Sequence, residues 1–218
     1  IRFIEQSALY YAQVRGLGTL KLNSTKEYVE KYTEEFYLVD LYYRRTLEAY
    51  HELITKENPI EQTLSDAKHQ LDLEYAKITN VLNLEWLTCV GEKGAWFTET
   101  GLKRQEDFYK NESDTSVKQV VIVCDALRYE VAKELMQELA KEKHIATIDA
   151  YQAMLPTETK YCKPALLPHH SLELNGTDMM VDGTLLTTTE QRTAHLGKYR
   201  EGAICTRYED VMNGDAQS

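Results

Sequence analysis

Two polar side chains follow consecutive strand-like runs of the sequence, and both are of types that support phosphoryl chemistry. Asp125 closes residues 120–124, an apolar and mostly β-branched run that is typical of a buried parallel strand. Thr159 follows a second run, residues 144–154. Ligands of open α/β sheets bind beyond the carboxyl ends of the strands. We therefore expect Asp125 and Thr159 to lie near each other if the two strands are neighbours.

These residue types suit an activated displacement. A carboxylate at a strand end can hold a metal or a base, and a threonine hydroxyl becomes a useful nucleophile only when a base or a metal activates it. Amides at the start of the helix expected over residues 161–167 attract anions, so a hydroxyl there can face a phosphate. The competing interpretation is that Thr157 and Thr159 are helix caps, the commoner role of such hydroxyls.

Arg128 is a further candidate, three residues after Asp125. A guanidinium at this place can orient a carboxylate or contact the substrate. It can equally form a structural ion pair.

The first half of the chain carries helical patterns. Ser24 and Glu27 have the spacing of a capping box. Apolar residues then recur three or four positions apart over residues 29–54 and 64–82, with a break at Pro59. The pattern predicts two long helices packed as an antiparallel pair, with the many tyrosines facing the core or a partner.

In the second half of the chain, the spacing of the apolar residues is no longer helical throughout and includes strand-like runs. Strand-like runs alternate with an amphipathic helix expected over residues 127–143, and a further strand is expected over residues 202–207. We expect a helical region at 1–116 and an α/β domain at 117–218. The apolar face of the expected helix, directed inward, consists of Val131, Leu135, Leu139 and Ala140.

Composition narrows the class of protein. The chain is 43% hydrophobic and 28% charged, as in ordinary globular proteins. Its net charge of −10 argues against nucleic acid or an anionic membrane as the main partner. No apolar run reaches the roughly 18 to 20 residues of a membrane span. The scattered Cys89, Cys124, Cys162 and Cys205 fit reduced thiols in a cytoplasmic protein. Because the chain starts at Ile1, we expect a piece of a longer protein.

The motifs carry a resemblance. Val-Ile-Val-Cys-Asp125-Ala-Leu-Arg-Tyr-Glu130, Leu155-Pro-Thr-Glu-Thr159 and Ala165-Leu-Leu-Pro168 resemble the PglZ domain of the alkaline phosphatase superfamily. Val181-Asp-Gly183 and Gln191-Arg192 also resemble later segments of that domain. The resemblance covers about residues 117 to 205. The tyrosine-rich helices upstream resemble, more loosely, those of the type A PglZ proteins of BREX phage-defence systems.

This resemblance implies a fold and an active centre. It implies the start of a three-layer α/β/α domain, truncated here, and a centre of two divalent metals, usually zinc. Asp125 is then a metal ligand and Thr159 the nucleophile, because the similar Pro-Thr-x-Thr pattern of nucleotide pyrophosphatases uses its second threonine. Thr157 is the fallback nucleophile, and Arg128 is a possible substrate-contacting or orienting residue.

The chain also departs from the family. The superfamily completes its metal sites with a later Asp-His-Gly segment, and no Asp-His pair occurs here. A catalytic zinc needs about three protein ligands. We interpret His169, His170 and His195 as surface histidines and not as ligands. We therefore expect this piece alone to be inactive and to bind metal weakly or not at all.

The resemblance implies a metal-dependent phosphatase or phosphodiesterase that serves phage defence in the bacterial cytoplasm, with a phosphoester substrate. The alternative is a non-catalytic scaffold whose helical region docks other defence proteins, including a DNA methyltransferase. A third reading is a signalling effector behind a receiver domain. Membrane binding and direct nucleic acid binding are not expected. The identity of the substrate and the oligomeric state are not encoded in any motif of the chain.

Overall fold

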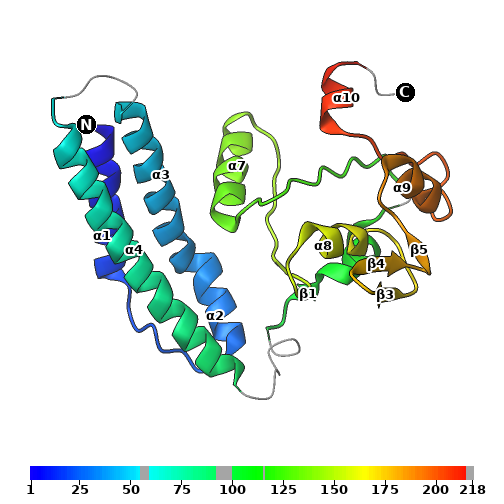
Figure 1. Cartoon of the computed structure of the whole chain (residues 1–218), viewed down its shortest axis with the longest axis horizontal. Helices are drawn as coiled ribbons and strands as arrows, with labels where there is room; N and C mark the ends of the chain where they lie inside the picture. The colour runs from blue at the N-terminus through cyan, green and yellow to red at the C-terminus, as the bar shows by residue number, and fades with distance from the viewer. Residues whose placement is uncertain (55–58, 92–99, 115, 215–218) are drawn as a thin grey trace. The chain divides into compact units, whose positions relative to one another are not determined.

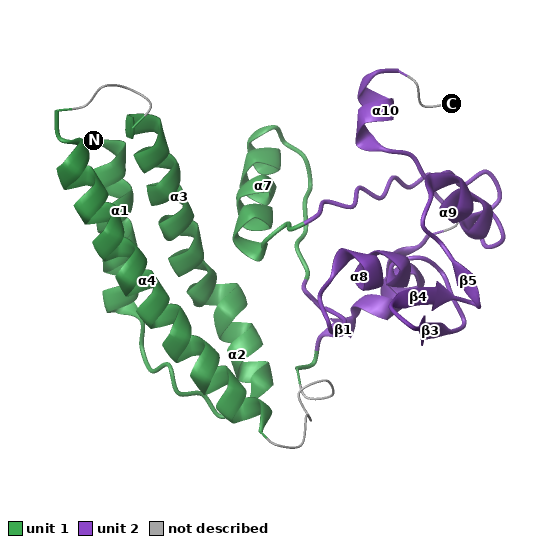
Figure 2. Ribbon diagram, viewed as in Figure 1, with its two compact units in different colours: residues 1–101, 126–149 green, residues 102–125, 150–218 purple. Residues whose placement is uncertain are grey.

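The computed structural model describes residues 1–54, 59–91, 100–114 and 116–214. The chain forms two compact units, which Figure 2 shows in different colours. The first consists of Ile1–Gly101 and Ala126–Asp149, and the second of Leu102–Asp125 and Ala150–Ser218. The compact units are thus built from interleaved segments of the chain. No observation tests the expected domain boundary at residue 116, which stays a prediction.

The first unit is helical, as expected for the first half of the chain. Ser24 caps the helix α2 (Thr25–Lys31), since its hydroxyl accepts a hydrogen bond from the Glu27 amide at 3.2 Å. The helix α3 packs against α1, α4 and α7. Figure 1 shows these elements: α1 (Arg2–Gly16), α2 (Thr25–Lys31), a π-helical turn (Tyr32–Phe36), α3 (Tyr37–Ile54), α4 (Glu61–Val90) and α7 (Tyr129–Lys141).

The core of the first unit runs between α1, α3 and α4. Tyr10, Val39 and Leu71 meet at its centre and are almost completely buried. Several tyrosines pack here with their hydroxyls bonded to carboxylates, as tyrosines in a core commonly do. Tyr32 and Tyr75, for example, both donate to Asp40, at 2.7 and 2.8 Å. The expectation that the tyrosines of this region are packing residues is confirmed at these positions.

The second unit is a small mixed α/β region. Two residues of β1 pair in parallel with two of β2, and β3, β4 and β5 form an antiparallel meander. Its strands are β1 (Lys103–Arg104), β2 (Tyr151–Gln152), β3 (Leu172–Asn175), β4 (Asp178–Val181) and β5 (Thr184–Leu185). Its helices are a 3₁₀ turn (Gln105–Asp107), α6 (Phe108–Glu112), α8 (Thr159–Ala165), α9 (Thr189–Leu196) and α10 (Tyr208–Met212).

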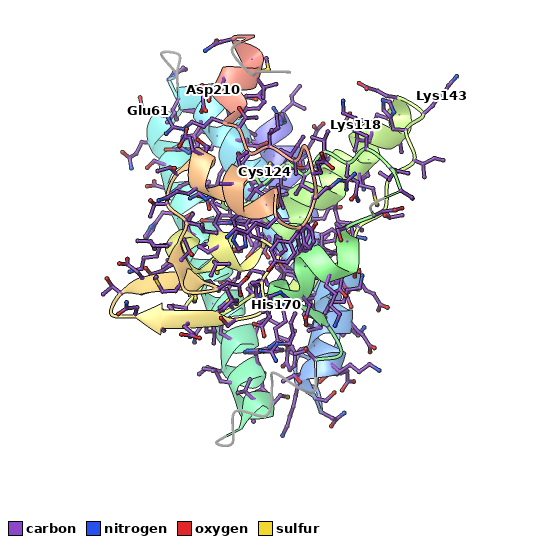
Figure 3. All side chains as sticks on the ribbon, turned by 90° about the vertical axis from the view of Figure 1, so that its right-hand side faces the viewer. Glu61, Lys118, Cys124, Lys143, His170 and Asp210 are labelled. Atoms are coloured by element: carbon purple, nitrogen blue, oxygen red, sulfur yellow. The ribbon has the colours of Figure 1, made fainter. Side chains whose placement is uncertain are left out.

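The buried strand expected over residues 120–124 is not formed. Residues 116–124, all of them described, contain no strand, and Val120 and Ile122 are 79% and 75% exposed. Cys124 at the end of the run, which is labelled in Figure 3, is exposed as well. The physical reason is that a strand exists only through hydrogen bonds to a neighbour. The sequence shows that the run is apolar, but not which segment pairs with it.

The other expected strands are shorter or absent. Of residues 144–154, only Tyr151–Gln152 form a strand. Residues 202–207, also described, are not in a strand. The expected three-layer sheet is therefore not assembled by the described residues, and the observed fold is a helical region followed by a small mixed α/β region.

The amphipathic helix α7 is present but turned differently from the expectation. Leu135, expected to face inward, is 52% exposed, whereas Glu130 is completely buried. The prediction of an inward apolar face was wrong for Leu135 and for Ala140, which is exposed as well. The helix packs against α3 through ion pairs with Arg44 and Arg45 and through the ring of Tyr37, which lies 5.6 Å from that of Tyr129.

None of the helices among the described residues combines the length and the apolar character that crossing a bilayer requires.

Candidate functional site

The structure brings Asp125 and Thr159 together within the second unit. The hydroxyl of Thr159 donates to the carboxylate of Asp125, with Oγ1 3.1 Å from Oδ1 and 3.3 Å from Oδ2. These residues are thirty-four positions apart in the sequence, so the contact is tertiary. Both side chains are exposed, and a substrate in solution can therefore reach the pair.

Thr159 is the first residue of α8, but it does not cap that helix. The cap position is Glu158, which makes no side-chain capping hydrogen bond. The hydroxyl of Thr159 is directed instead to Asp125. The competing interpretation of Thr159 as a helix cap is therefore wrong. Thr157, the fallback nucleophile, is exposed and lies two residues before the helix.

The backbone next to Asp125 is strained. Ala126 has a φ of +56°, in the left-handed region that non-glycine residues rarely adopt. The Cβ of a non-glycine residue makes this conformation cost about 1 to 2 kcal/mol. Strain of this kind gathers at functional sites, where the surrounding structure holds the residue in place. The turn after Asp125 is thus a defined conformation of the chain.

Arg128 lies at the N-terminal cap of α7 and is exposed. Its charge acts on Tyr75 of α4: burial raises the pKa of the Tyr75 hydroxyl, with Asp40 adding to the rise, and Arg128 partly offsets it. The role of Arg128 toward a substrate stays a prediction.

The residues present do not fit a two-zinc centre. Among the described residues, no three His, Cys, Asp or Glu side chains are grouped so that they could hold a metal ion. Asp125 and Thr159 supply one carboxylate and one hydroxyl, whereas a catalytic zinc takes about three protein ligands. No catalytic step through a metal is therefore derived from these residues.

The three histidines of the second unit differ in environment. His170, which is labelled in Figure 3, is exposed as expected, and His169 is half-buried. His195 is buried, so its interpretation as a surface residue was wrong. Its Nε2 donates to the Pro168 carbonyl at 2.7 Å, and its ring lies 5.5 Å from that of Tyr199. His195 sits on a helix with few apolar residues, which is why the sequence did not reveal its burial.

Asp182 organises the turn between β4 and β5. Its Oδ1 accepts hydrogen bonds from the amides of His170 and Ser171, both at 2.8 Å, and its Oδ2 accepts one from the Tyr199 hydroxyl at 2.9 Å. These hydrogen bonds lower the pKa of Asp182 to about 2. The Asp182-Gly183 dipeptide indicated a turn, but the three distant donors could not be read from it.

Comparison with protein families identifies the family to which the chain belongs. Residues 106–218, slightly more than half of the chain, match the family described as the BREX system PglZ alkaline phosphatase-like domain. The structure thus carries its Asp125–Thr159 pair inside an alkaline phosphatase-like domain. The chain belongs to the PglZ family.

Two curated proteins are similar to the chain. The alkaline phosphatase-like protein PglZ of Bacillus cereus (strain H3081.97) is 28% identical over 95% of this chain and 25% of its own length. The alkaline phosphatase-like protein BrxZ of Escherichia coli O9:H4 (strain HS) is 34% identical over 48% of this chain and 13% of its own length. The chain thus spans a quarter or less of these relatives. No solved structure matches it significantly.

Proposed function

We propose that the longer protein to which this chain belongs is a phosphoesterase of the alkaline phosphatase type, acting in the cytoplasm in BREX phage defence. The single observation that carries the proposal is the exposed hydrogen bond from Thr159 to Asp125. It joins the two side chains that the resemblance assigns to nucleophile and metal ligand. Membership of the PglZ family supports the same reading.

In this proposal Thr159 is the nucleophile. With its proton directed to Asp125, its Oγ1 has lone pairs free to face a phosphoryl group. The bond from Oγ1 to phosphorus forms as Oγ1 gives its proton to Asp125 and the ester bond breaks, and the leaving oxygen takes up a proton and departs as the alcohol. Water then hydrolyses the phosphothreonine, which releases the phosphoryl group and restores the Thr159 hydroxyl. Two divalent metals, zinc by resemblance, would supply charge stabilisation, and Asp125 is the one ligand assigned here. The other ligands are proposed to come from residues other than those described.

The proposal includes a fold. In the complete domain, residues 120–124 form a strand of a three-layer α/β/α sheet that ends at Asp125. Their exposure here supports this, because a β-branched run with both faces apolar is typical of a strand covered on both sides.

The test uses the full-length protein with zinc and an aryl phosphodiester. Asp125→Ala and Thr159→Ala are each expected to lower kcat at least about 100-fold, since removing a nucleophile or its activating group costs this much or more. Thr157→Ala is the matched control and is expected to stay within about threefold of wild type. Loss in Thr157→Ala alone would move the nucleophile to that residue. Full activity in both Asp125→Ala and Thr159→Ala would overturn the proposal.

A second candidate is a scaffold that docks other defence proteins, such as the methyltransferase of the system, through the helical unit. One observation favours it: Leu73, Leu84 and Leu87 of α4 are all more than half exposed. Leu73 and Leu84 are three helical turns apart and lie on one face. Phage resistance retained in a Thr159→Ala strain that has lost all phosphoesterase activity would favour the scaffold.

A further inference from the structure

One glutamine side chain bridges the two ends of the segment that carries Thr159. Oε1 of Gln105 accepts a hydrogen bond from the Met154 amide at 3.1 Å, and its Nε2 donates one to the Cys162 carbonyl at 3.0 Å. Met154 lies five residues before Thr159, and Cys162 lies three residues after it. A single side-chain amide is therefore bound to the main chain on both sides of Thr159.

Packing does little to hold the chain between these two contacts. Residues 155–160 are all exposed, whereas Met154 and Cys162 are half-buried. Within the segment, the Glu158 amide donates to the Pro156 carbonyl at 2.8 Å, and the Cys162 amide donates to the Glu158 carbonyl at 2.9 Å. An exposed segment gains little from apolar contacts, so its hydrogen bonds decide how well it is ordered.

The main chain of Gln105 is itself held at the edge of this segment. Gln105 directly follows β1, which pairs in parallel with β2. It also begins the 3₁₀ turn Gln105–Asp107, which packs against α8. Its side-chain amide offers one acceptor and one donor, as a main-chain peptide group does. The bridge therefore continues, beyond the last strand pair, the hydrogen bonding that joins β1 to β2.

All parts of this arrangement belong to the second unit, which also contains Asp125 and Thr159. The Thr159 hydroxyl donates to Asp125 at 3.1 Å while the main chain on either side of Thr159 is bound to Gln105. Gln105 stands immediately before residues 106–218, which match the PglZ family. The family match therefore does not include this side chain.

We propose that Gln105 is a positioning residue, which fixes residues 154–162 and thereby directs the Thr159 hydroxyl to Asp125 and to the phosphoryl group. Gln105 acts through the main chain on both sides of Thr159 and takes no part in the making or breaking of bonds. This inference rests on the proposed function, since it assigns a task toward the same site.

The test uses the full-length protein with zinc and an aryl phosphodiester. Gln105→Met keeps the length of the side chain and removes both hydrogen bonds. It is expected to lower kcat about tenfold or more and to change KM less than about twofold, since small displacements of reacting groups are costly.

Gln191→Met is the matched control. Oε1 of Gln191 accepts hydrogen bonds from the amides of Thr187 and Thr188, at 2.9 and 3.1 Å, at the start of α9. This variant also loses two hydrogen bonds to the main chain of the second unit, so its cost in stability should be similar. Its kcat is expected to stay within about threefold of wild type. All assays are made well below each variant's unfolding midpoint.

A double substitution separates positioning from a general loss of structure. If Gln105 acts through Thr159, adding Gln105→Met to Thr159→Ala leaves the residual activity unchanged, because residues that act as a unit are not additive. A further fall by the same factor as in the wild-type background would overturn the positioning role.

Hydrogen exchange tests the bridge without reference to activity. Peptides that cover residues 154–162 are followed by mass spectrometry in the same full-length proteins. Exchange there is expected to be about fivefold faster or more in Gln105→Met, since the hydrogen bonds that order the segment are lost. Exchange of this segment in Gln191→Met is expected to equal that of wild type. Unchanged exchange in Gln105→Met would overturn the proposal.

The outcomes separate the positioning role from the proposed function. If Thr159→Ala abolishes activity but Gln105→Met equals Gln191→Met, the positioning role is wrong and the phosphoesterase stands. If Asp125→Ala and Thr159→Ala are both fully active, the proposed function fails, and the positioning role fails with it.

Discussion

The two units differ in how completely they bury the apolar residues that their own segments supply. In the first unit, Tyr10, Val39 and Leu71 come from three helices and close a core among themselves. In the described part of the second unit, Val181 and Ala165 are buried, but the run over residues 120–123 stays exposed. Helices satisfy their backbone internally and need only an apolar neighbour, whereas a strand also needs a hydrogen-bonding partner. The helical unit therefore depends less than the second unit on further segments of the chain for its stability.

The largest effect is expected in the helical core. Leu71→Ala leaves a cavity where Leu71 meets Tyr10 and Val39, and should lower the free energy of unfolding by about 2 to 5 kcal/mol. Leu73→Ala on the same helix is the control, because Leu73 is 51% exposed, and it should cost less than about 0.5 kcal/mol. Urea unfolding followed by helical circular dichroism measures both. Equal losses in the two variants would contradict the core described here.

A smaller effect is expected from the turn of the second unit. Asp182→Ala removes the acceptor of three hydrogen bonds and places alanine at a φ of +48°, so we expect a loss of about 2 kcal/mol. Asp178→Ala, at an exposed strand position nearby, should have almost no effect. Hydrogen exchange of the His170 and Ser171 amides reports this turn directly. Unchanged exchange in Asp182→Ala would contradict the assigned role.

The lowered pKa of Asp182 predicts that the stability of this turn falls at acidic pH. Hydrogen bonds lower the pKa of Asp182 to about 2, below its ordinary value near 4. A depressed folded-state pKa contributes stability above the unfolded value, and that stability is lost as the pH falls through about 4 to 2. Exchange of the His170 and Ser171 amides should therefore accelerate across this window. In Asp182→Asn the acceleration over the window should be smaller.

Removal of one helix cap should lower the stability of either unit by about the same free energy. Ser24 caps α2 and Thr188 caps α9, each accepting a hydrogen bond from the amide three residues on, both at 3.2 Å. Replacing either with alanine should cost about 1 kcal/mol. Replacement with glycine, which also suits cap positions, should cost only a few tenths. Urea unfolding for Ser24 and amide exchange within α9 for Thr188 measure the two effects.

The smallest effect on the stability of this chain is expected in the exposed run over residues 120–123. Ile122→Ser should change the stability of this chain by less than about 0.5 kcal/mol, because Ile122 is 75% exposed. In the full-length protein, where we propose a covered strand, the same change should cost about 2 to 4 kcal/mol. A large loss already in this chain would show that the run is buried without further segments. A negligible loss in both would remove the support for the sheet.

Local patterns predicted most of the helical region. The capped helix from Ser24 and the long helix after Pro59 are present, because helical periodicity and capping depend on neighbours three or four residues away. The helix α1 was missed, since its pattern is weak and it is ordered by packing against α3. The orientation of α7 was mistaken because its partner, Arg44, lies far away in the sequence.

By itself, the sequence determined that Asp125 and Thr159 are candidate site residues, that helices precede them, and that the chain resembles the PglZ family. Only the tertiary structure decided that the Thr159 hydroxyl bonds to Asp125, that Glu130 is buried against arginine, and that residues 120–124 lie exposed. Short-range rules fix residue types and helical faces. Pairing between distant segments depends on which partners are present, and no local pattern contains that information.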